Sequence, residues 1–186
     1  MAKERKIDMV ILGLLSHDNL TGYDIKKQID ASISFFWKGS FGNIYPALAS
    51  LEESGMIKKI PDKNNGSGRE RIFYGITDAG RESLKEWLTE SKTVNDLKYE
   101  MLLKVFFGGT VENELSIATI EEFEKDITRD LLILKTYKEN LSNVLDERDH
   151  VFFYLTVAFG VETYEAYLRW CTEAKRMLTE KMNLKA

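Results

Sequence analysis

One segment of the sequence combines a helix start signal, a helical apolar pattern and a helix stop signal. Ser40 is a favourable N-cap residue, because its hydroxyl can accept a hydrogen bond from a backbone N–H of the first turn. Gly55 can adopt the left-handed conformation that ends many helices. Between them, Phe41, Ile44, Leu48 and Leu51 recur at the spacing of one helical face. The segment therefore predicts a helix over residues 40–54.

A second face of this predicted helix carries small or polar side chains, namely Ser40, Asn43, Ala47 and Ser50. No long side chain on this face would hold another surface away, so the helix could pack on a core and still lie in a groove. The alternative is a surface helix that happens to carry small residues. The segment alone does not separate these two interpretations.

Pro46 bears on where this helix begins. Proline is tolerated in the first turn of a helix, whereas deeper in the helix it removes a hydrogen bond and clashes with the preceding turn. The regular helix therefore begins near Gly42, or it begins earlier and is bent at Pro46. We favour a start at Ser40, because serine is a good cap.

Two predicted helices and an aromatic cluster precede this segment. The first helix covers residues 7–15, and the second begins at Thr21, where Asp24 three residues later completes the pattern of a capping box. Lysines of the second helix lie on its exposed side, where they are solvated or contact phosphates. The aromatic residues 35–37 most simply fill the core beneath the next helix, although Trp37 could instead line a ligand pocket.

After Gly55 the pattern changes to two short β-permissive segments, residues 56–61 and 69–76, which are separated by a turn-rich stretch. This predicts a two-stranded hairpin with a long polar tip. From residue 58 to residue 71 there are five basic and two acidic residues. Such cations can contact phosphates beside a helix in a groove, although an ordinary solvated turn has a similar composition. Thr77 then begins a helix that runs through Leu84, Trp87 and Leu88.

Three helices followed by a hairpin is the layout of a winged helix-turn-helix domain. Within it, six short segments resemble, in order and spacing, the PadR family of bacterial transcriptional regulators over about the first half of the chain. These segments are residues 11–15, 21–25, 36–37, 44–48, 51–57 and 74–80. The resemblance implies a dimeric DNA-binding repressor, often of detoxification, efflux or phenolic-acid stress genes. The hairpin tip departs from the family pattern, because no proline precedes its arginine.

The resemblance also implies which positions face double-stranded DNA. We expect base-edge or methyl contacts from Asn43 and Tyr45, and phosphate contacts from cations of the second helix and the hairpin. The full set of expected DNA-binding residues is Tyr23, Lys27, Lys38, Ser40, Gly42, Asn43, Tyr45, Lys63, Asn64, Arg69 and Arg71.

The second half of the chain predicts three helices, over residues 94–107, 116–146 and 150–182. The last helix is more apolar than the surface of a monomer allows, which indicates packing against a partner. The larger PadR-like proteins, which this chain resembles in length, dimerise through such a C-terminal helical arm. Gly160 lies within the last helix, where close approach of another helix would explain it. The expected dimer contacts are Phe153, Val157, Tyr164, Tyr167 and Trp170.

The predicted fold class is therefore mainly α. We expect a winged helix-turn-helix DNA-binding domain with a two-stranded β wing over residues 1–92, and a helical dimerisation domain over residues 93–186. Residues 1–92 contain 14 basic and 13 acidic residues, whereas residues 93–186 contain 12 and 17. A polyanion should consequently bind the first half.

Several function classes are disfavoured. The single cysteine, Cys171, excludes an intrachain disulfide and suits the reducing cytoplasm. No run approaches the ~20 apolar residues that cross a membrane. The sequence shows no phosphate-binding glycine loop, no metal-ligand spacing and no nucleophile–histidine–carboxylate set, so we expect no enzyme, cofactor or metal.

Two functions remain. The first is a homodimeric regulator, a repressor by the family resemblance, which binds a palindromic operator and is open to release by a small apolar or aromatic effector. Aromatic residues at 35–37, 106–107 and 152–153 could line an effector cavity, although such residues are more often core. The alternative is a helical protein-interaction adaptor whose winged domain does not use DNA.

Overall fold

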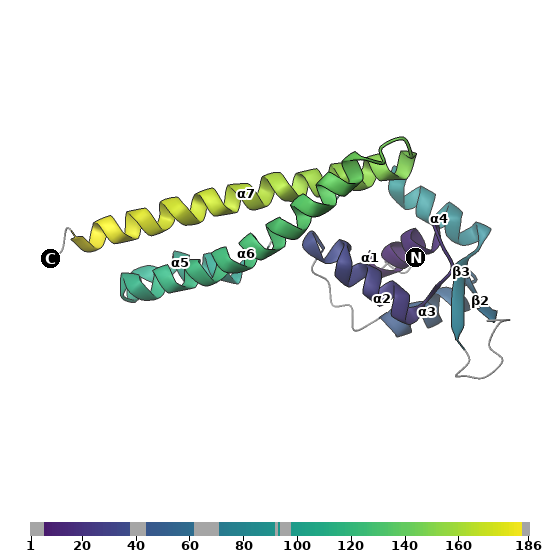
Figure 1. Cartoon of the computed structure of the whole chain (residues 1–186). Helices are drawn as coiled ribbons and strands as arrows, with labels where there is room; N and C mark the ends of the chain where they lie inside the picture. Colours follow the sequence, from purple (N-terminus) through teal and green to yellow (C-terminus); the bar gives the residue numbers. More distant parts are fainter. Residues whose placement is uncertain (1–5, 38–43, 62–70, 92, 94–97, 184–186) are drawn as a thin grey trace. The chain divides into compact units, whose positions relative to one another are not determined.

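The computed structural model describes residues 6–37, 44–61, 71–91, 93 and 98–183, with side chains described up to Glu180. The chain divides into two compact units, residues 1–95 and 96–186 (Figure 1). The first unit is a small helical domain with a three-stranded sheet, and the second consists of helices. This confirms the predicted mainly α class.

The described part of the first unit contains four α-helices, a 3-10 turn and an antiparallel sheet in which β3 lies between β1 and β2. The predicted hairpin is confirmed as β2 and β3, with Ile57 opposite Ile76. The additional strand β1 places Leu20 opposite Tyr74. In chain order the elements are α1 (Lys6–Leu15), β1 (Leu20–Thr21), α2 (Gly22–Ala31), η1 (Ile33–Phe35), α3 (Ile44–Glu53), β2 (Ile57–Pro61), β3 (Ile72–Ile76) and α4 (Asp78–Thr89).

One hydrophobic core holds these elements together. Ile11 and Leu12 of α1, Ile25 of α2 and Leu48 of α3 are almost completely buried in it, and Ile57 of β2 joins them. Burying a large aliphatic side chain stabilises a fold by roughly 1.5–3 kcal/mol. The core therefore fixes α1, α2, α3 and the base of the hairpin as one body.

Local capping explains where α2 and α4 begin. The Thr21 hydroxyl accepts a hydrogen bond from the Asp24 backbone N–H, and the Asp24 carboxylate accepts one from the Thr21 N–H, both at 3.2 Å. The predicted capping box is thus confirmed. At α4, the Thr77 hydroxyl accepts a hydrogen bond of 3.1 Å from the Gly80 N–H and donates one to the Gly55 carbonyl.

The end of α3 is closed by a Schellman motif. Gly55 has a φ of 72°, and its N–H donates to the Glu52 carbonyl at 3.0 Å. The Met56 N–H donates to the Leu51 carbonyl at 2.9 Å. The predicted left-handed glycine is therefore confirmed, and it turns the chain directly from α3 into β2.

Two expectations for the first unit are wrong, and a third is not tested. Phe36 is 58% exposed and does not fill the core, and neither Phe35 nor Trp37 is fully buried. Leu88 is exposed, so only Leu84 and Trp87 of α4 pack against the core. The proposed helix start at Ser40 lies outside the described residues, and the described part of α3 begins at Ile44.

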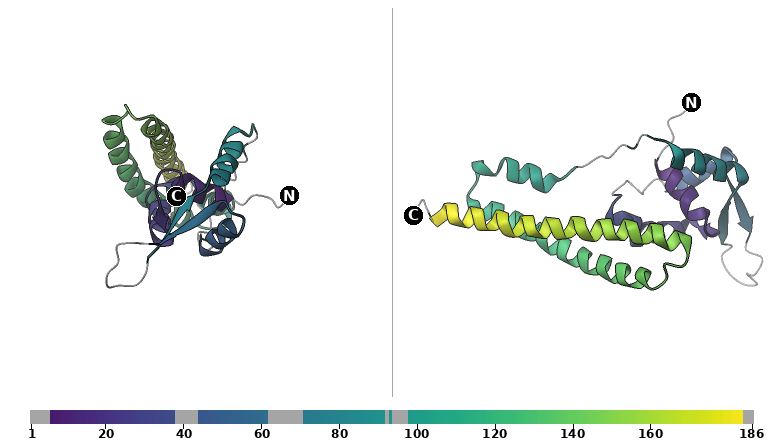
Figure 2. Two further views of the ribbon diagram at one scale, coloured as in Figure 1. Left: turned by 90° about the vertical axis from the view of Figure 1, so that its right-hand side faces the viewer. Right: turned by 90° about the horizontal axis from the view of Figure 1, so that it is seen from above.

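The second unit contains α5 (Glu100–Phe106), η3 (Gly108–Thr110), α6 (Asn113–Ser142) and α7 (Arg148–Asn183). The two long helices run antiparallel and pack against each other (Figure 2). Their predicted existence is confirmed. The helix predicted over residues 94–107 is shorter than expected, because Lys98 and Tyr99 are not helical and α5 begins at Glu100.

Close packing and ion pairs fix the register of α6 and α7. A Cβ at Gly160 of α7 would lie 3.2 Å from Leu134 Cδ1 of α6, so the predicted close helix approach is found. Lys135 Nζ lies 2.7 Å from Glu165 Oε1, and Lys175 pairs with Glu124. These charges join the two helices beside a buried seam that includes Cys171.

Two glycines of the first unit should respond oppositely to alanine. Both Gly13 in α1 and Gly55 have open space where a Cβ would lie, but only Gly55 has positive φ. We expect Gly13→Ala to stabilise the chain by about 0.5–1 kcal/mol, because alanine favours helix. Gly55→Ala should destabilise it by about 1 kcal/mol. Urea unfolding measures both, and a Gly55→Ala variant as stable as the wild type would contradict the Schellman argument.

Candidate nucleic-acid interface

The described part of α3 has one buried and one exposed side. Ile44, Leu48 and Leu51 face the core, as predicted. Ala47 was expected on the outward side, and this is wrong. It is completely buried, because it lies three residues after Ile44 and four before Leu51 on the same side of the helix. The exposed side instead carries Tyr45, Pro46, Ala49, Ser50 and Glu53.

Tyr45 is held in place by the first residue of α2. A Cβ at the buried Gly22 would lie 2.8 Å from Tyr45 Cε1, so the tyrosine ring rests against the α2 backbone. Most of Tyr45 still faces solvent, with 65% of its surface exposed, and the neighbouring Tyr23 is 69% exposed. The contact between α2 and α3 therefore presents two phenol rings on one surface.

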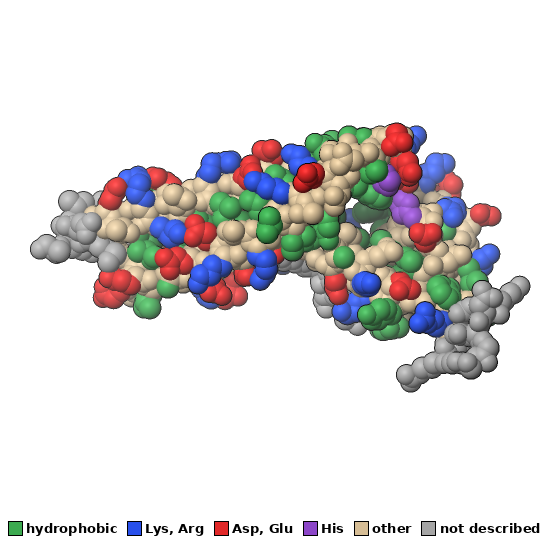
Figure 3. Space-filling model, in the orientation of Figure 1, with side chains coloured by type: hydrophobic (Ala, Val, Ile, Leu, Met, Phe, Trp, Pro, Cys, Tyr) green, Lys and Arg blue, Asp and Glu red, His purple; other side chains and the backbone are tan. Residues whose placement is uncertain are grey.

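Lys26 lies close to both rings. Lys26 forms an ion pair of 2.9 Å with Asp30. That hydrogen bond raises the pKa of Lys26, and Tyr23 and Tyr45 are close enough to contribute. Lys27 is exposed on the same helix. Basic and hydrophobic side chains accordingly lie next to each other over α2 and α3 in Figure 3.

The positive charge of Arg71, directly before β3, lies near Asp24 in the first turn of α2. The hydrogen bond from the Thr21 hydroxyl lowers the pKa of Asp24, and the nearby Arg71 and Lys27 lower it further. Arg71 is exposed, as are Lys58 and Lys59 of β2. Lys59 also pairs with Glu52 at 2.8 Å, which ties the hairpin to α3.

The structure thus brings together four of the predicted DNA-binding residues on one surface: Tyr23, Lys27, Tyr45 and Arg71. We call this surface the α2–α3 face. The other predicted residues lie outside the described part of the chain and stay predictions: Lys38, Ser40, Gly42, Asn43, Lys63, Asn64 and Arg69. Lys26 and Gly22 were not among the expected site residues. Lys26 follows Tyr23 by three residues, so helical spacing places both on the same face of α2, and this spacing could have identified the lysine as a site residue.

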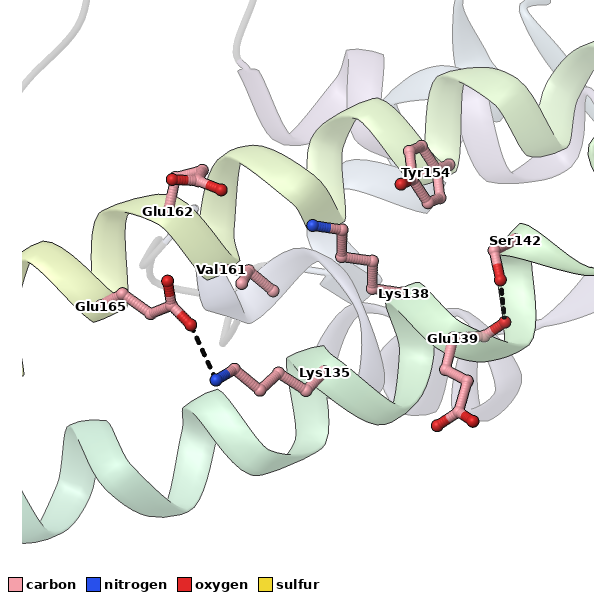
Figure 4. A pocket seen from close by; sticks show the side chains of 8 residues that line it. All are labelled: Lys135, Lys138, Glu139, Ser142, Tyr154, Val161, Glu162 and Glu165. Carbon is pink, nitrogen blue, oxygen red and sulfur yellow. Dashed lines mark hydrogen bonds and ion pairs between the residues drawn. The ribbon is translucent and has the colours of Figure 1, made fainter.

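In the second unit, a wedge opens between α6 and α7 with a volume of about 380 Å³ (Figure 4). Its lining is largely charged. The ion pair between Lys135 and Glu165 crosses it and lowers the pKa of Glu165. Lys138, Glu139 and Glu162 add further charges, so the wedge offers a polar rather than an apolar cavity.

Some of the expected dimer contacts are exposed, and others make contacts within the second unit itself. Phe153 is exposed, and Val157 is partly exposed. Tyr164 is buried within the unit, and Tyr167 shares a hydrogen bond with Tyr99. Trp170 is partly buried, at a second and smaller pocket.

Two prominent apolar residues of the second unit were not among the expected dimer contacts. Phe159 is 69% exposed on α7, and Phe106 is 80% exposed on α5. The sequence shows that both residues are apolar, but apolar character alone does not tell which residues of a helix face solvent.

The described part of the chain offers neither a metal site nor a membrane-spanning helix. No group of three or more His, Cys, Asp or Glu residues there could hold a metal ion. None of its helices combines the length and the apolar character that a membrane crossing requires.

Two family models match the chain in succession. Residues 11–86 match the transcriptional regulator PadR-like family, and residues 97–179 match the family described as virulence activator alpha C-term. The likeness to the PadR-like family therefore lies within the first unit of the chain. It is 33% identical over 104 residues to the negative transcriptional regulator PadR of Bacillus subtilis. The alignments with the matched curated relatives span about half of their length, 57% for this PadR and 42% for a probable transcriptional regulator of Mycobacterium tuberculosis.

Solved structures are similar over almost the whole chain. Bacillus subtilis PadR in complex with operator DNA is 25% identical, with a TM-score of 0.83, covering 95% of this chain and 99% of that one. The same protein in complex with p-coumaric acid gives a TM-score of 0.74 at 25% identity, with 94% and 99% covered. The PadR-like regulator BC1756 from Bacillus cereus is 27% identical with a TM-score of 0.78, at the same coverage.

Proposed function

We propose that the chain is a member of the PadR-like family and a transcriptional regulator that represses transcription as a homodimer on a palindromic operator. The observation that carries the proposal is the α2–α3 face, where a half-buried helix presents small side chains and phenols between cations. A similar fold in complex with operator DNA supports it.

In this proposal α3 enters the major groove and two copies occupy grooves about 34 Å apart. Tyr45 would contact base edges or a thymine methyl group, as would Asn43, which lies outside the described residues. Lys27 and Arg71 would contact phosphates on either side of α3. Lys26 is neutralised by Asp30 in the unbound chain, so a phosphate must compete with that carboxylate.

Two substitutions should separate base readout from phosphate contact. Asn43→Ala should reduce the preference for the operator over unrelated duplex by about 1–3 kcal/mol. Arg71→Ala should weaken binding to both duplexes by the same factor, and should lower the slope of log affinity against log salt by about 0.9. Gel-shift titrations at two salt concentrations, with the promoter region of the chain's own gene, measure both effects.

The exposed Lys85 of α4 supplies the control for this experiment, because Lys85→Ala removes a cation away from the α2–α3 face. Its affinity and salt slope should equal those of the wild type. If Asn43→Ala and Arg71→Ala both bind as the wild type does, the regulator proposal fails and the adaptor alternative is favoured.

Gly22 should affect DNA binding through Tyr45. The added methyl group would lie 2.8 Å from Tyr45 Cε1 and 3.3 Å from Leu48 Cδ1. The exposed tyrosine ring must therefore move, whereas the buried leucine has to give by only a few tenths of an ångström. Because alanine is also well tolerated in a helix, the fold should persist. Gly22→Ala and Tyr45→Ala should each weaken operator binding, and the double variant should bind no more weakly than Tyr45→Ala alone. Additive losses in this double-mutant cycle would show that Gly22 acts otherwise.

We infer that the exposed apolar surface of α7 forms the homodimer. No residue from Val151 to Gly160 is buried, although Phe152, Phe153, Leu155 and Phe159 all lie there. Contiguous apolar patches of this kind mark contact surfaces. A stable interface buries roughly 1,200–2,000 Å² in total, which a long helix can supply.

Sedimentation equilibrium tests this inference. The double substitution Phe153→Glu and Phe159→Glu places charges in the proposed interface at exposed positions, so the chain should fold and dissociate at least tenfold more readily. Thr172→Glu, at an exposed polar position of the same helix, should leave the association unchanged. A double variant that associates as the wild type does would place the interface elsewhere.

A further inference from the structure

We propose that Asp30 limits how tightly the chain holds DNA, because its carboxylate occupies Lys26 in place of a phosphate. The two residues lie one turn apart on α2, and Lys26 Nζ is 2.9 Å from Asp30 Oδ2. Both side chains face solvent, with 59% and 52% of their surfaces exposed. The inference rests on the proposed regulator function, because it concerns the affinity of the same surface for DNA.

The charge of Lys26 lies at the α2–α3 face. Tyr23 precedes the lysine by three residues, so helical spacing places both on one side of α2. Tyr23 and Tyr45 are also near enough to add to the rise in the pKa of Lys26, which its hydrogen bond with Asp30 mainly causes. A cation beside these two rings is placed to contact a phosphate when α3 lies in a groove.

The stability of α2 does not explain the carboxylate of Asp30. The helix ends at Ala31, so Asp30 lies in its last turn, where a negative charge opposes the helix dipole. The lysine also precedes the acid, which is the weaker order for a pair at this spacing. Exposed ion pairs contribute little to stability in any case. What the carboxylate changes most is therefore the charge that Lys26 offers to its surroundings.

A carboxylate and a phosphate compete for the same ammonium group. Both are anions, and each accepts a charge-assisted hydrogen bond from it. A duplex must break the pair with Asp30 before Lys26 gains a phosphate, so binding gains only the difference between two similar interactions. Phosphates carry no sequence information. Asp30 therefore lowers the affinity for operator and for unrelated duplex alike.

Other cations near this face also have acidic neighbours. Lys59 of β2 pairs with Glu52 of α3 at 2.8 Å, and Asp24 is close to Arg71. Those two carboxylates also act within the fold, since Asp24 completes the capping box and Glu52 ties the hairpin to α3. The pair at Asp30 lies within one helix, so a substitution there tests the competition without loosening a contact between two elements.

Asp30→Asn keeps the shape of the side chain and removes its charge. It should strengthen binding to both duplexes by about 1.5- to 5-fold per chain, which is the range that exposed pairs contribute, and by about 2- to 25-fold when two copies bind together. The slope of log affinity against log salt should become steeper by up to about 0.9 per chain. Gel-shift titrations at two salt concentrations measure both. The thermal unfolding midpoint should be no lower than that of the wild type.

Two further variants control for other causes. With Lys26→Ala in place, Asp30→Asn should leave the affinity as it is in Lys26→Ala alone, because no lysine remains to be released. Glu82 pairs with Lys85 at 3.4 Å on α4, away from the α2–α3 face. Glu82→Gln removes the same charge from a similar exposed pair, and it should leave the affinity and the salt slope unchanged.

Three results would overturn the proposal. They are an unchanged affinity in Asp30→Asn, an equal gain in the Lys26→Ala background, and an equal gain from Glu82→Gln. The second would mean that Asp30 only repels DNA, and the third that only net charge matters.

The same titrations separate this proposal from the regulator proposal. If the wild type prefers the operator and Asp30→Asn binds no more tightly, only the competition at Lys26 is refuted. If no variant prefers the operator but Asp30→Asn binds both duplexes more tightly, the regulator proposal fails and the competition is supported. If neither the wild type nor any variant binds a duplex, both are refuted.

Discussion

The packing of α3 into the core of the first unit is the contact on which the α2–α3 face depends. Ile44, Ala47, Leu48 and Leu51 occupy the inner side of the helix. This leaves Tyr45, Pro46, Ala49, Ser50 and Glu53 on the outer side. The same core holds α2 at the angle where Gly22 meets Tyr45. Because both helices contribute to one surface, a change in their packing alters that surface even when no exposed residue is changed.

The hairpin depends on the same helix through its end. The left-handed Gly55 turns the chain into β2, and Thr77 returns to the Gly55 carbonyl from the end of β3. The ion pair between Lys59 and Glu52 adds a direct tie. Surface pairs of this kind contribute little energy, so the geometry of the Schellman turn and the core matters more for the hairpin's direction.

The sequence predicts features with local causes well. The capping box at Thr21, the glycine at the end of α3 and the hairpin each depend on residues close in sequence, and the structure confirms them. Features with distant causes were missed. The two-residue strand β1 exists because Tyr74 and Phe73 pair with it, and the first helix of the second unit is shorter than its apolar pattern indicates.

The candidate sites show the same division. The exposure of Tyr45 and Tyr23 follows from helical periodicity, but the contact between Tyr45 and Gly22 joins two helices and could not be read from spacing. Ala47 shows why sequence alone was not sufficient. A small side chain is compatible with a groove-facing side and with a buried core position, and only the packing of neighbouring helices determines which of the two it occupies. The hydrogen bond between Tyr99 and Tyr167 spans 68 residues, so no sequence pattern indicated the pocket around it.

Regulation by a ligand in the second unit would be subject to a thermodynamic constraint. A molecule in the smaller pocket, which is lined by residues such as Tyr99, Tyr167 and Trp170, shifts DNA binding only if it binds two conformations of the dimer with different affinity. The coupling is reciprocal, so operator DNA must weaken ligand binding by the same factor. Tyr167 is suited to such coupling because it contacts α5 through Tyr99 and α6 through Phe123 while belonging to α7. A ligand that moves these three helices against one another also moves Phe153 and Phe159 of the proposed dimer surface, since they lie on the same continuous helix.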